Sequence, residues 1–540
     1  MSQDAMSQDA PSSTQTTPQA KLTKLAFLSV TDKKQLESVA RPLVEHYGYE
    51  LLATGGTRQR LMAAGLPVRD LSDVTGFVEL LDGRVKSLHP EIFAGILAER
   101  SRPDHLQQLS FVIDTVIVNL YPFEEGLKQE HSAQDLNAMR ELIDIGGVAL
   151  LRAAAKNFVS VNVLCKPEQY PDFLQALQTG QGETSQPFRQ TLAAEAFRLT
   201  SAYDTHIADY LSQSNPEPMH SAMPSTLTLP LLKIQEMRYG ENPHQQAALY
   251  GLNTTTVDFD CLQGKQLSFN NLLDMEAAWK IASEFAGTNA CAIIKHNNPC
   301  GVAISARSGL DAFKTALDAD PLSAFGGIVA FSTPVDEATA SHLKDIFLEV
   351  IVAPAFSTEA LQVLQGKKNL RLVTRPLIDR EQLDYREVKQ VGANRFLVQQ
   401  PNPDQAAPCD FEQSLNVVTE RKPTEDELRD LIFAWKVVRH VKSNAIVLAK
   451  EGRTVGIGGG QTSRIGALES ALKTASDEAT HAVMASDGFL PAADNLHAAA
   501  QNRVTAIIQP GGSLKDPEMI ELANRYQMAM VTTQIREFRH

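Results

Sequence analysis

The chain has 540 residues, of which 43% are hydrophobic and 21% charged, and its formal net charge is −14 at pH 7. At about 150 residues per domain it is too long for a single core, so we expect several globular domains. The acidic balance argues against broad nucleic-acid binding, which needs a basic surface, and no apolar run approaches the ~20 residues that span a membrane.

The start of the chain and its cysteines bear on where the protein is located. Residues 1–22 are rich in Ser, Gln, Thr, Asp and Pro and lack the basic and apolar regions of a secretion signal, so we expect a disordered tail. The five cysteines are scattered, without a C-x-x-C pair. This pattern is typical of a reducing cytoplasm and argues against a disulfide framework or a structural zinc site.

Apolar runs alternate with helical periodicity between residues 25 and 164. We expect strands over residues 25–30, 49–53, 115–118 and 159–164, a helix after each of the first two, and a further helix that ends at Lys156. Strands that alternate with helices predict an α/β domain with a doubly wound parallel sheet and helices on both of its faces.

Polar and glycine-rich segments follow the strands of this predicted sheet. They lie at residues 29–33, 54–57, 119–121 and 144–147. The carboxyl ends of parallel strands meet in one crevice, and helix N-termini there favour anions, so a phosphate site is the natural interpretation. A single Gly-Gly pair is a weak signal because tight turns need glycine in any case. Four such strand ends in one sheet are stronger evidence.

A basic stretch runs from Gly83 to Pro90. Within it, Arg84 and Lys86 lie on the same side of the chain if the segment is extended, so both side chains could bind an anionic or carboxamide substrate. A solvated basic loop explains this octapeptide equally well.

Residues 176–230 are expected to connect two units, with a helix around 193–210 and a linker at Ser212–Pro218. The second unit begins near Thr228. We expect one of its helical faces to be core: Met275, Ala278, Trp279, Ala282 and Phe285. Two Ala-Ile-Ile runs, at 292–294 and 506–508, each lead into a turn and hint at two related lobes.

The strand predicted at residues 291–294 ends at Lys295 and His296. Strand ends deliver side chains to a fixed place, so the pair is a candidate for acid–base chemistry, although a surface turn with a solvated Lys explains the pair, taken alone, at least as well. The segment also resembles the zinc deaminase signature. That interpretation is rejected because Asn298 replaces the catalytic Glu and Ala303 replaces the second Cys, so we expect no metal site.

Further polar segments interrupt the apolar pattern of the second unit. They are Arg238–Gln245, Lys442–Asn444, Gly456–Arg464, Ser486–Asp494 and Arg536–His540. The glycine string at 456–460 lacks the spacing and the distal acid of a dinucleotide fingerprint, which argues against a nicotinamide-dependent dehydrogenase.

Taken together, these segments resemble the bifunctional purine biosynthesis family, which joins a phosphoribosylaminoimidazolecarboxamide (AICAR) formyltransferase to an inosine monophosphate (IMP) cyclohydrolase. The resemblance covers nearly everything from Leu25 to His540. Its most specific segments are Leu81–Pro90, Ile143–Gly147, Leu151–Asn157, Arg238–Gln245, Lys295-His296 and Arg536–His540.

The resemblance implies an architecture and two reactions. Residues 23–175 would form a methylglyoxal-synthase-like cyclohydrolase domain, 176–230 a connecting segment, and 231–540 a formyltransferase region of two cytidine-deaminase-like α/β lobes. Formyl transfer from 10-formyltetrahydrofolate to AICAR gives formyl-AICAR and tetrahydrofolate, and dehydrative ring closure then gives IMP. The family implies a cytoplasmic homodimer with no tightly bound cofactor and no nucleic-acid or membrane partner.

Formyl transfer needs a base, because the AICAR amine is a weak nucleophile, and a cation beside the developing oxyanion. The resemblance implies His296 as the base and Lys295 as the oxyanion partner, with Asn444 and Asp494 in support. It assigns substrate binding in this region to Arg238, Tyr239, Asn242, His244, Phe489 and Arg536.

Ring closure is intramolecular, so the protein mainly has to hold the reacting groups together and handle protons. The resemblance assigns catalysis to Lys86, Tyr121 and Lys156. It assigns substrate binding to Ser29, Lys33, Thr54, Gly55, Gly56, Thr57, Arg84, Ser87, Asn119, Asp144, Gly146 and Gly147.

The sequence departs from the family pattern in two places. Ser87 stands where Thr is expected, which keeps the hydroxyl. Residues 488–494 read Gly-Phe-Leu-Pro-Ala-Ala-Asp where Ala-Phe-Phe-Pro-Phe-Arg-Asp is usual, so an aromatic ring and an Arg are lost. This second departure bears on folate or interface contacts.

A non-enzymatic alternative is a ligand-sensing protein, because the fold type of the first domain also serves as a phosphate-binding regulatory module. That alternative predicts anion binding without turnover. It gives Lys295 and His296 no role.

Overall fold

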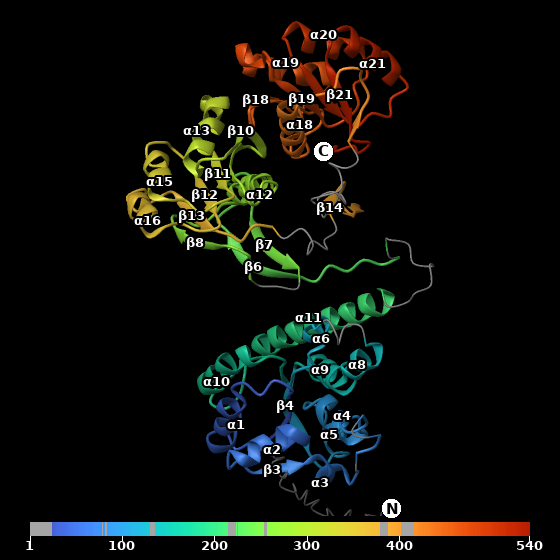
Figure 1. Ribbon diagram of the computed structural model, residues 1–540. Helices are drawn as coiled ribbons and strands as arrows, with labels where there is room; N and C mark the ends of the chain where they lie inside the picture. Colours follow the sequence, from blue (N-terminus) through green and yellow to red (C-terminus); the bar gives the residue numbers. More distant parts are fainter. Residues whose placement is uncertain are drawn as a thin grey trace, which may run out of the picture. The chain divides into compact units, whose positions relative to one another are not determined.

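The computed structural model describes residues 24–77, 79–81, 84–129, 135–213, 223, 225–252, 256–378, 387–400 and 415–540. The predicted tail at 1–22, Cys409 and the predicted linker beyond Gln213 lie outside the described residues. The chain divides into two compact units, Met1–Pro230 and Leu231–His540 (Figure 1).

The first unit is built on a five-stranded parallel sheet with the strand order β3-β2-β1-β4-β5. The strands are β1 (Lys24–Ser29), β2 (Glu50–Ala53), β3 (Val68–Asp70), β4 (Val112–Val118) and β5 (Asn162–Leu164). The four predicted strands are confirmed with shifted ends. Strand β3 was not predicted, because the sequence Val-Arg-Asp contains no apolar run.

Helices cover both faces of this sheet, as predicted. One face carries α1 (Leu36–Glu45), α2 (Gly55–Ala63) and α10 (Tyr170–Thr179), and the other carries α4 (Pro90–Leu97), α9 (Gly146–Lys156) and α11 (Gln186–Gln213). Alternation along β1 shows the reason: Leu25 and Phe27 join the core under α9, whereas Ala26 and Leu28 join the core under α1. Shorter helices are α3 (Leu71–Thr75), α5 (Pro103–Leu106), α6 (Phe123–Leu127), α8 (Leu136–Glu141) and the 3-10 turn η1 (Pro167–Gln169).

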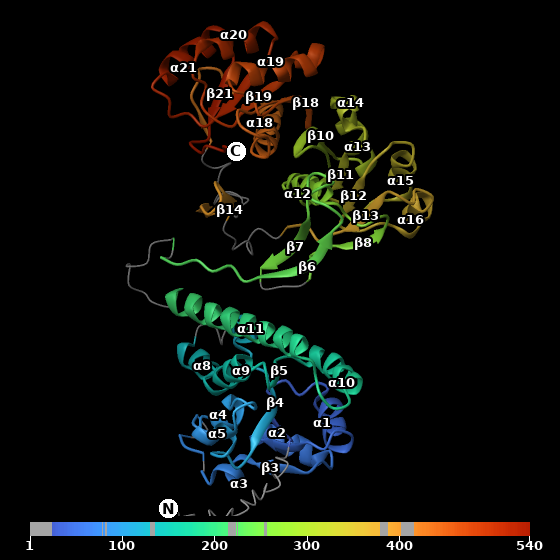
Figure 2. The same cartoon turned by 180° about the vertical axis from the view of Figure 1, so that it is seen from behind.

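Helix α11 is longer than the predicted helix at 193–210 and belongs to the first unit. It packs against α9 and β5 (Figure 2), and its residues Leu192, Ala193 and Ala196 are buried in the same core as α9. Most of the described part of the segment expected to connect the units therefore packs on the first sheet.

The second unit contains a twelve-stranded mixed sheet made of two halves with the same strand pattern. The first half has the order β10-β9-β11-β12-β13-β8, and the second has β18-β17-β19-β20-β21-β16. In each half a hairpin comes first, three parallel strands follow, and an antiparallel edge strand closes the sheet. The halves meet where β10 and β18 pair antiparallel.

The bounds of these elements follow the two halves. The first half has β8 (Asp260–Gln263), α12 (Phe269–Ser283), β9 (Asn289–Lys295), β10 (Asn298–Ser305), α13 (Gly309–Ala319), α14 (Pro321–Ala324), β11 (Ile328–Phe331), α15 (Glu337–Leu343), β12 (Val350–Ala353), α16 (Thr358–Leu364) and β13 (Arg371–Thr374). The second has β16 (Asn416–Val417), α18 (Glu425–Val438), β17 (Ile446–Lys450), β18 (Arg453–Gly458), α19 (Arg464–Ala475), η4 (Ser476–Ala479), β19 (Val483–Ser486), α20 (Ala493–Gln501), β20 (Ala506–Gln509), α21 (Asp516–Arg525) and β21 (Ala529–Thr532). Two separate hairpins are β6 (Leu231–Met237) with β7 (Ala247–Leu252), and β14 (Glu387–Gln390) with β15 (Phe396–Gln399).

Helices α12 and α18 share one buried core with strands of both halves. The apolar face predicted on α12 is part of this core, so its interpretation as core is confirmed. The two Ala-Ile-Ile runs, by contrast, are not equivalent: residues 292–294 lie in β9, whose counterpart is β17, whereas 506–508 lie in β20, whose counterpart is β12. Two lobes of like topology exist, but the two runs that suggested them lie in strands that are not counterparts of each other.

Glycines allow a helix to lie close to the hairpin in each half. A Cβ on Gly301 of β10 would lie 1.9 Å from the carbonyl oxygen of Ala316 in α13. A Cβ on Gly458 of β18 would lie 1.9 Å from the carbonyl oxygen of Ala467 in α19. Part of the glycine string therefore serves helix packing.

A buried ionic cluster joins the ends of α12 and α18 to the C-terminal segment. Arg439 donates to the Glu537 carboxylate at 2.9 Å and lies 3.7 Å from the Glu284 carboxylate. The Nε2 atom of His440 lies 2.8 Å from the same Glu284 carboxylate. All four side chains are at most 5% exposed. Burial lowers the pKa of His440 to about 4, so the neutral imidazole donates to Glu284.

This pKa predicts a loss of stability in mild acid. Below pH 6.5 the unfolded chain protonates His440, whereas the folded chain does so only near pH 4, so the second unit should lose roughly 3 kcal/mol over that window. A His440→Gln variant should lack this contribution. Urea unfolding followed by tryptophan fluorescence reports on this unit alone, because both tryptophans of the chain, Trp279 and Trp435, lie in it. The same pH slope in both proteins would contradict a neutral His440.

Candidate active sites

Hydrogen bonds tie together the loops at the carboxyl ends of β1, β2 and β4. The Thr57 hydroxyl accepts from Val30 N at 3.0 Å and donates to Val30 O at 3.1 Å. The Asn119 side chain accepts from Thr31 N at 2.6 Å and donates to Asp32 O at 2.8 Å. These loops therefore form one surface, as expected for the carboxyl ends of parallel strands.

These loops line a pocket with a volume of about 1140 Å³. Helices α2 and α9 begin at its wall, so their positive dipole ends lie beside it. Every residue that the resemblance assigned to the first unit lies in its lining except Lys156: Ser29, Lys33, Thr54, Gly55, Gly56, Thr57, Arg84, Lys86, Ser87, Asn119, Tyr121, Asp144, Gly146 and Gly147.

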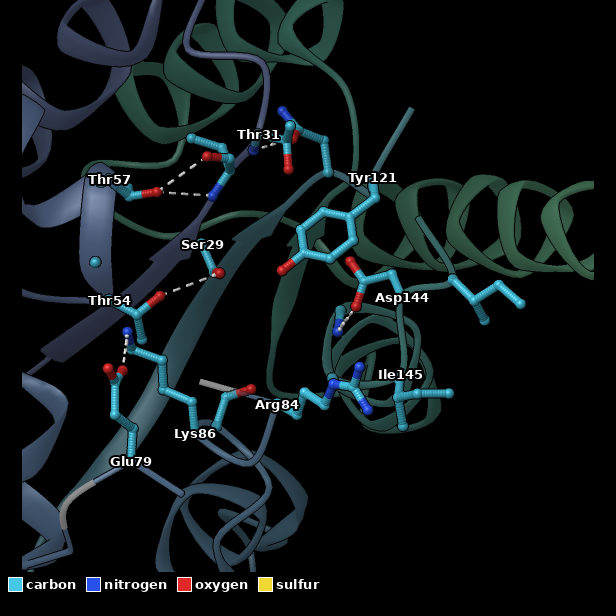
Figure 3. A pocket seen from close by; sticks show the side chains of 18 of the residues that line it. Ser29, Thr31, Thr54, Thr57, Glu79, Arg84, Lys86, Tyr121, Asp144 and Ile145 are labelled. Atoms are coloured by element: carbon cyan, nitrogen blue, oxygen red, sulfur yellow. Dashed lines mark hydrogen bonds and ion pairs between the residues drawn. The ribbon is translucent and has the colours of Figure 1, made fainter. Parts of the chain in front are cut away.

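Cations of this pocket are held by acids at its rim. The Lys86 ammonium lies 2.6 Å from the Glu79 carboxylate, and Arg84 lies 2.5 Å from that of Glu141. Figure 3 shows Arg84, Lys86, Tyr121 and Asp144 around one space. Both acids are about half exposed, so an anionic ligand competes with partners that are only weakly held.

Asp144 is a half-buried acid of the pocket. Its carboxylate accepts from Gly147 N at 2.7 Å at the start of α9, and burial raises its pKa. Tyr203 supports the loop from α11: its hydroxyl accepts from Asp144 N at 2.9 Å and donates to Leu142 O at 2.6 Å. Sequence reasoning missed Tyr203, because it lies on a helix that was assigned to the connecting segment.

Lys156 lies away from this pocket. It is the last residue of α9, whose first residue, Gly146, lines the pocket, and it borders a separate apolar hollow with Arg152, Phe158 and Phe197. Over the eleven residues of α9 the two ends are about 15 Å apart. The structure therefore does not bring Lys156 together with Lys86 and Tyr121 within this chain.

The second candidate site lies at the turn between β9 and β10. The Lys295 ammonium donates to the carbonyl oxygens of Phe325 at 3.1 Å and Gly326 at 2.9 Å, and His296 is exposed at the turn. Phe325 and Phe347 stack beside it with ring centroids 5.2 Å apart, and both are more than half exposed. The sequence analysis missed these aromatic residues because they follow no regular pattern.

Asn444 lies in the second half and its side chain is held from both ends. Its amide nitrogen donates to Gln461 O at 3.0 Å, and its oxygen accepts from the Arg464 guanidinium at 3.0 Å. Arg464 is itself buried against the fully buried Asp487. Asn298 of the first half lies close to Gly459 of the second, since its oxygen would lie 3.7 Å from a Cβ on that glycine.

The departure at residues 488–494 has a packing consequence. A Cβ on Gly488 would lie 2.5 Å from the Phe538 ring and 2.6 Å from Arg464, so the alanine usual in the family does not fit this conformation. Leu490 is fully buried, whereas Phe489 and Asp494 are exposed. Asp494 accepts from the backbone and side-chain nitrogens of Asn495, both at 2.7 Å.

The remaining predicted residues of the second unit lie in two exposed segments. Arg536 stacks on Phe538 in the C-terminal segment, 4.6 Å from its ring centroid, and Ser443 N donates to Arg539 O at 2.9 Å, which places this segment beside Asn444. The turn between β6 and β7 carries the others: Arg238, Tyr239, Asn242 and His244. Its Glu241 carbonyl accepts from Asn270 of α12 at 3.3 Å.

Two searches of the described residues concern metals and membranes. No three His, Cys, Asp or Glu side chains gather there in a way that could hold a metal ion. Among the same residues, no helix is both long and apolar enough to cross a membrane.

The fold and the pocket define the class of the first unit. Residues 35–149 match the model of the MGS-like domain, an α/β domain whose five-stranded parallel sheet is described above. Residues 154–474 match the model described as "AICARFT/IMPCHase bienzyme".

Full-length relatives agree with these matches. The chain is 47% identical over 523 residues to the bifunctional purine biosynthesis protein PurH of Cyanothece sp. (strain PCC 7425 / ATCC 29141), covering 96% of this chain and 99% of that protein. It is 48% identical over 530 residues to PurH of Desulfitobacterium hafniense (strain DSM 10664 / DCB-2), covering 96% of this chain and all of that protein. A solved structure titled "Crystal structure of ForH" is 35% identical over 36% of this chain, but its TM-score of 0.32 carries no argument.

The chain belongs to the AICARFT/IMPCHase bienzyme family. It is a bifunctional enzyme, an AICAR formyltransferase and IMP cyclohydrolase, and it catalyses the final two steps of IMP synthesis. Neither the ligand-sensing nor the dehydrogenase interpretation of the sequence agrees with this membership.

The contact between Gly147 and Asp144 predicts a sensitive position in the pocket. A Cβ at residue 147 would lie 2.5 Å from Asp144 Oδ2, so a Gly147→Ala variant should displace the carboxylate. Because the family resemblance assigns this pocket to ring closure, we expect the variant to slow that reaction roughly tenfold or more. The measurement is IMP formation from supplied formyl-AICAR. Formyl transfer to AICAR should be unchanged and serves as the control for folding. Ring closure at the wild-type rate would show that the position of this carboxylate is unimportant.

Proposed function

We propose that the two activities reside in two separate sites, ring closure in the pocket of the first unit and formyl transfer at the Lys295-His296 turn of the second. One observation carries the proposal: the residues that the family resemblance assigns to ring closure, Lys156 excepted, line one pocket, and the formyl-transfer residues are not among its described lining. AICAR, formyl-AICAR, IMP and folate are the expected small-molecule partners.

Ring closure needs little more than a held substrate and a route for protons. The carboxamide nitrogen attacks the formyl carbon and loses one proton. The formamide nitrogen then loses its proton as the C=N bond of the new ring forms, and the former formyl oxygen takes up both protons and leaves as water. Lys86 and Tyr121 present an ammonium and a hydroxyl to the pocket for these transfers. Asp144 is suited to hold the carboxamide, because a half-buried carboxylate can accept its N–H groups. The glycine turns at the starts of α2 and α9 are suited to the phosphate.

Formyl transfer needs a base and an oxyanion partner. His296 takes the proton of the amine as it attacks the formyl carbon, which becomes tetrahedral. Lys295 has three donors, and two of them are used on the carbonyl oxygens of Phe325 and Gly326. The third remains for the oxyanion. Collapse of the intermediate then breaks the bond between the formyl carbon and the folate nitrogen of 10-formyltetrahydrofolate. That nitrogen takes the proton held by His296 and leaves as tetrahydrofolate.

The surroundings of the turn support this assignment. Asn444 is held rigidly by Gln461 and Arg464, as a supporting polar group must be. The exposed pair Phe325 and Phe347 offers an apolar aromatic surface to the rings of the folate. The guanidinium groups of Arg238 and Arg536 are proposed to bind the nucleotide phosphate, with Tyr239, Asn242, His244, Phe489 and Asp494 completing the substrate contacts.

The finer architecture is also part of the proposal. We take each half of the twelve-stranded sheet as a cytidine-deaminase-like lobe, since the halves share one strand order. The formyltransferase region would be residues 231–540, and the cyclohydrolase domain 23–175 with the packed part of the connecting segment. A homodimer in the cytoplasm is the expected form, and the free thiols of Cys165, Cys261, Cys291 and Cys300 support a reducing compartment.

The two-site assignment is tested with two variants and two assays. His296→Ala should lose formyl transfer by at least about a hundredfold yet still convert supplied formyl-AICAR to IMP. Lys86→Ala should show the opposite: formyl transfer retained and ring closure lost. The measurements are tetrahydrofolate release from AICAR and 10-formyltetrahydrofolate, and IMP appearance from formyl-AICAR. A single variant that abolishes both reactions in a folded protein would refute separate sites.

A further inference from the structure

The turn that carries His296 has an unusual backbone. Lys295 pairs with Asn298 across the hairpin, so the loop has two residues, His296 and Asn297. Both have positive φ, 53° and 60°, as a type I′ hairpin turn requires. Asn tolerates this region well, whereas a histidine there is uncommon and needs support from its surroundings.

A carboxylate from a neighbouring helix supports this turn. Asp274 of α12 accepts from His296 N at 3.3 Å and from Asn297 N at 2.7 Å, with one oxygen for each. In this turn conformation both loop N–H groups reach the Asp274 carboxylate at the same time, so the two hydrogen bonds favour the type I′ backbone. Asp274 thus fixes the backbone from which the His296 side chain projects.

The second half of the unit contains the same device. Asp430 of α18 accepts from Glu451 N and Gly452 N, both at 2.8 Å. These residues form the two-residue loop of the β17–β18 hairpin and have φ of 55° and 70°. Asp274 and Asp430 are each the sixth residue of their helix.

The sequences of the two helices confirm that the acids are equivalent. Both contain Leu-x-Asp-x-x-x-Ala-Trp-Lys, at residues 272–280 and 428–436. A lysine precedes the loop in both hairpins, Lys295 in one and Lys450 in the other. The halves differ at the loop itself, where His296-Asn297 stands opposite Glu451-Gly452. The same pair of hydrogen bonds therefore supports a turn with a histidine in one half and a turn without a histidine in the other.

We propose that Asp274 is a positioning residue for formyl transfer, which holds the His296 turn in the conformation that aims the imidazole at the amine. Asp430 does the same for a turn without a catalytic role. This inference rests on the proposed role of His296. It names a residue that acts through the backbone of the base and does not touch the substrate.

The repeat supplies a matched control for the test. Asp274→Asn and Asp430→Asn each replace one acceptor oxygen under a type I′ loop by an amide group that cannot accept from the second N–H. We expect Asp274→Asn to lower kcat for formyl transfer roughly ten- to hundredfold, because displacing a catalytic base by about 1 Å reduces the rate by about that factor. KM for AICAR should stay within about twofold of the wild-type value. Asp430→Asn should keep kcat within about twofold. Ring closure of formyl-AICAR should be unchanged in both variants.

Unfolding followed by tryptophan fluorescence separates positioning from stability. Both variants are expected to shift the unfolding midpoint by a similar amount, since both lose the same bond. Equal kcat in the two variants, whether both low or both normal, would overturn the proposal. A change in KM for AICAR with an unchanged kcat in Asp274→Asn would also overturn it, because the positioning of a base acts on kcat.

His296→Ala, measured beside them, distinguishes the two ways of failing. If it retains formyl transfer, the proposed role of His296 is wrong and the positioning role falls with it. If it loses formyl transfer while Asp274→Asn does not, only the positioning role is wrong.

Discussion

The second unit depends on the antiparallel pairing of β10 with β18. Ile304 N donates to Gly452 O at 2.9 Å, and the fully buried Thr454 hydroxyl accepts from Val302 N at 2.9 Å and donates to Val302 O at 3.3 Å. Since the strands run in opposite directions, the turn before β10 lies at the end of β18. The Lys295-His296 pair of one half is thereby brought toward the Asn444 segment of the other.

The same pairing gives the hairpin turns of the two similar halves different surroundings. An antiparallel contact between like halves places their two hairpin turns at opposite ends of the seam, so each turn meets a different set of neighbours. The His296 turn meets the glycine string and, through Lys442-Asn444, the C-terminal segment. The Glu451 turn meets the end of β10. One fold, used twice, thus yields one candidate site and one structural turn.

Much of the first unit was predictable because its signals are local. Alternating apolar runs predicted the sheet, and the rule that parallel carboxyl ends converge predicted which loops share a pocket. Tyr203 was not predictable in this way, because its hydroxyl reaches Asp144 from α11, about sixty residues along the chain. Lys156 is a different case: the family motif assigns it to catalysis, whereas helical rise places it at the end of α9 away from the pocket of the same chain, so its role stays a prediction.

In the second unit the useful signal was a repeat and not a local pattern. The Leu-x-Asp-x-x-x-Ala-Trp-Lys segment contains both tryptophans of the chain and identifies the equivalent helices, whereas the two Ala-Ile-Ile runs matched strands that are not equivalent. Short apolar strings recur by chance because every buried strand needs them. A polar residue at a fixed helical position recurs only when a geometry requires it, as the backbone of a type I′ loop requires Asp274 and Asp430.

The two proposed sites must recognise the same nucleotide, because formyl-AICAR is the product of one reaction and the substrate of the other. The first unit offers backbone N–H groups and helix dipoles at glycine turns, and its Lys86 and Arg84 are already paired with Glu79 and Glu141. The second offers exposed guanidinium groups on a hairpin and on the C-terminal segment. Backbone donors are fixed before the ligand arrives, whereas exposed arginine side chains lose conformational freedom when they bind. A site that must also admit a folate gains from that freedom, and a site that only closes a ring gains from rigidity.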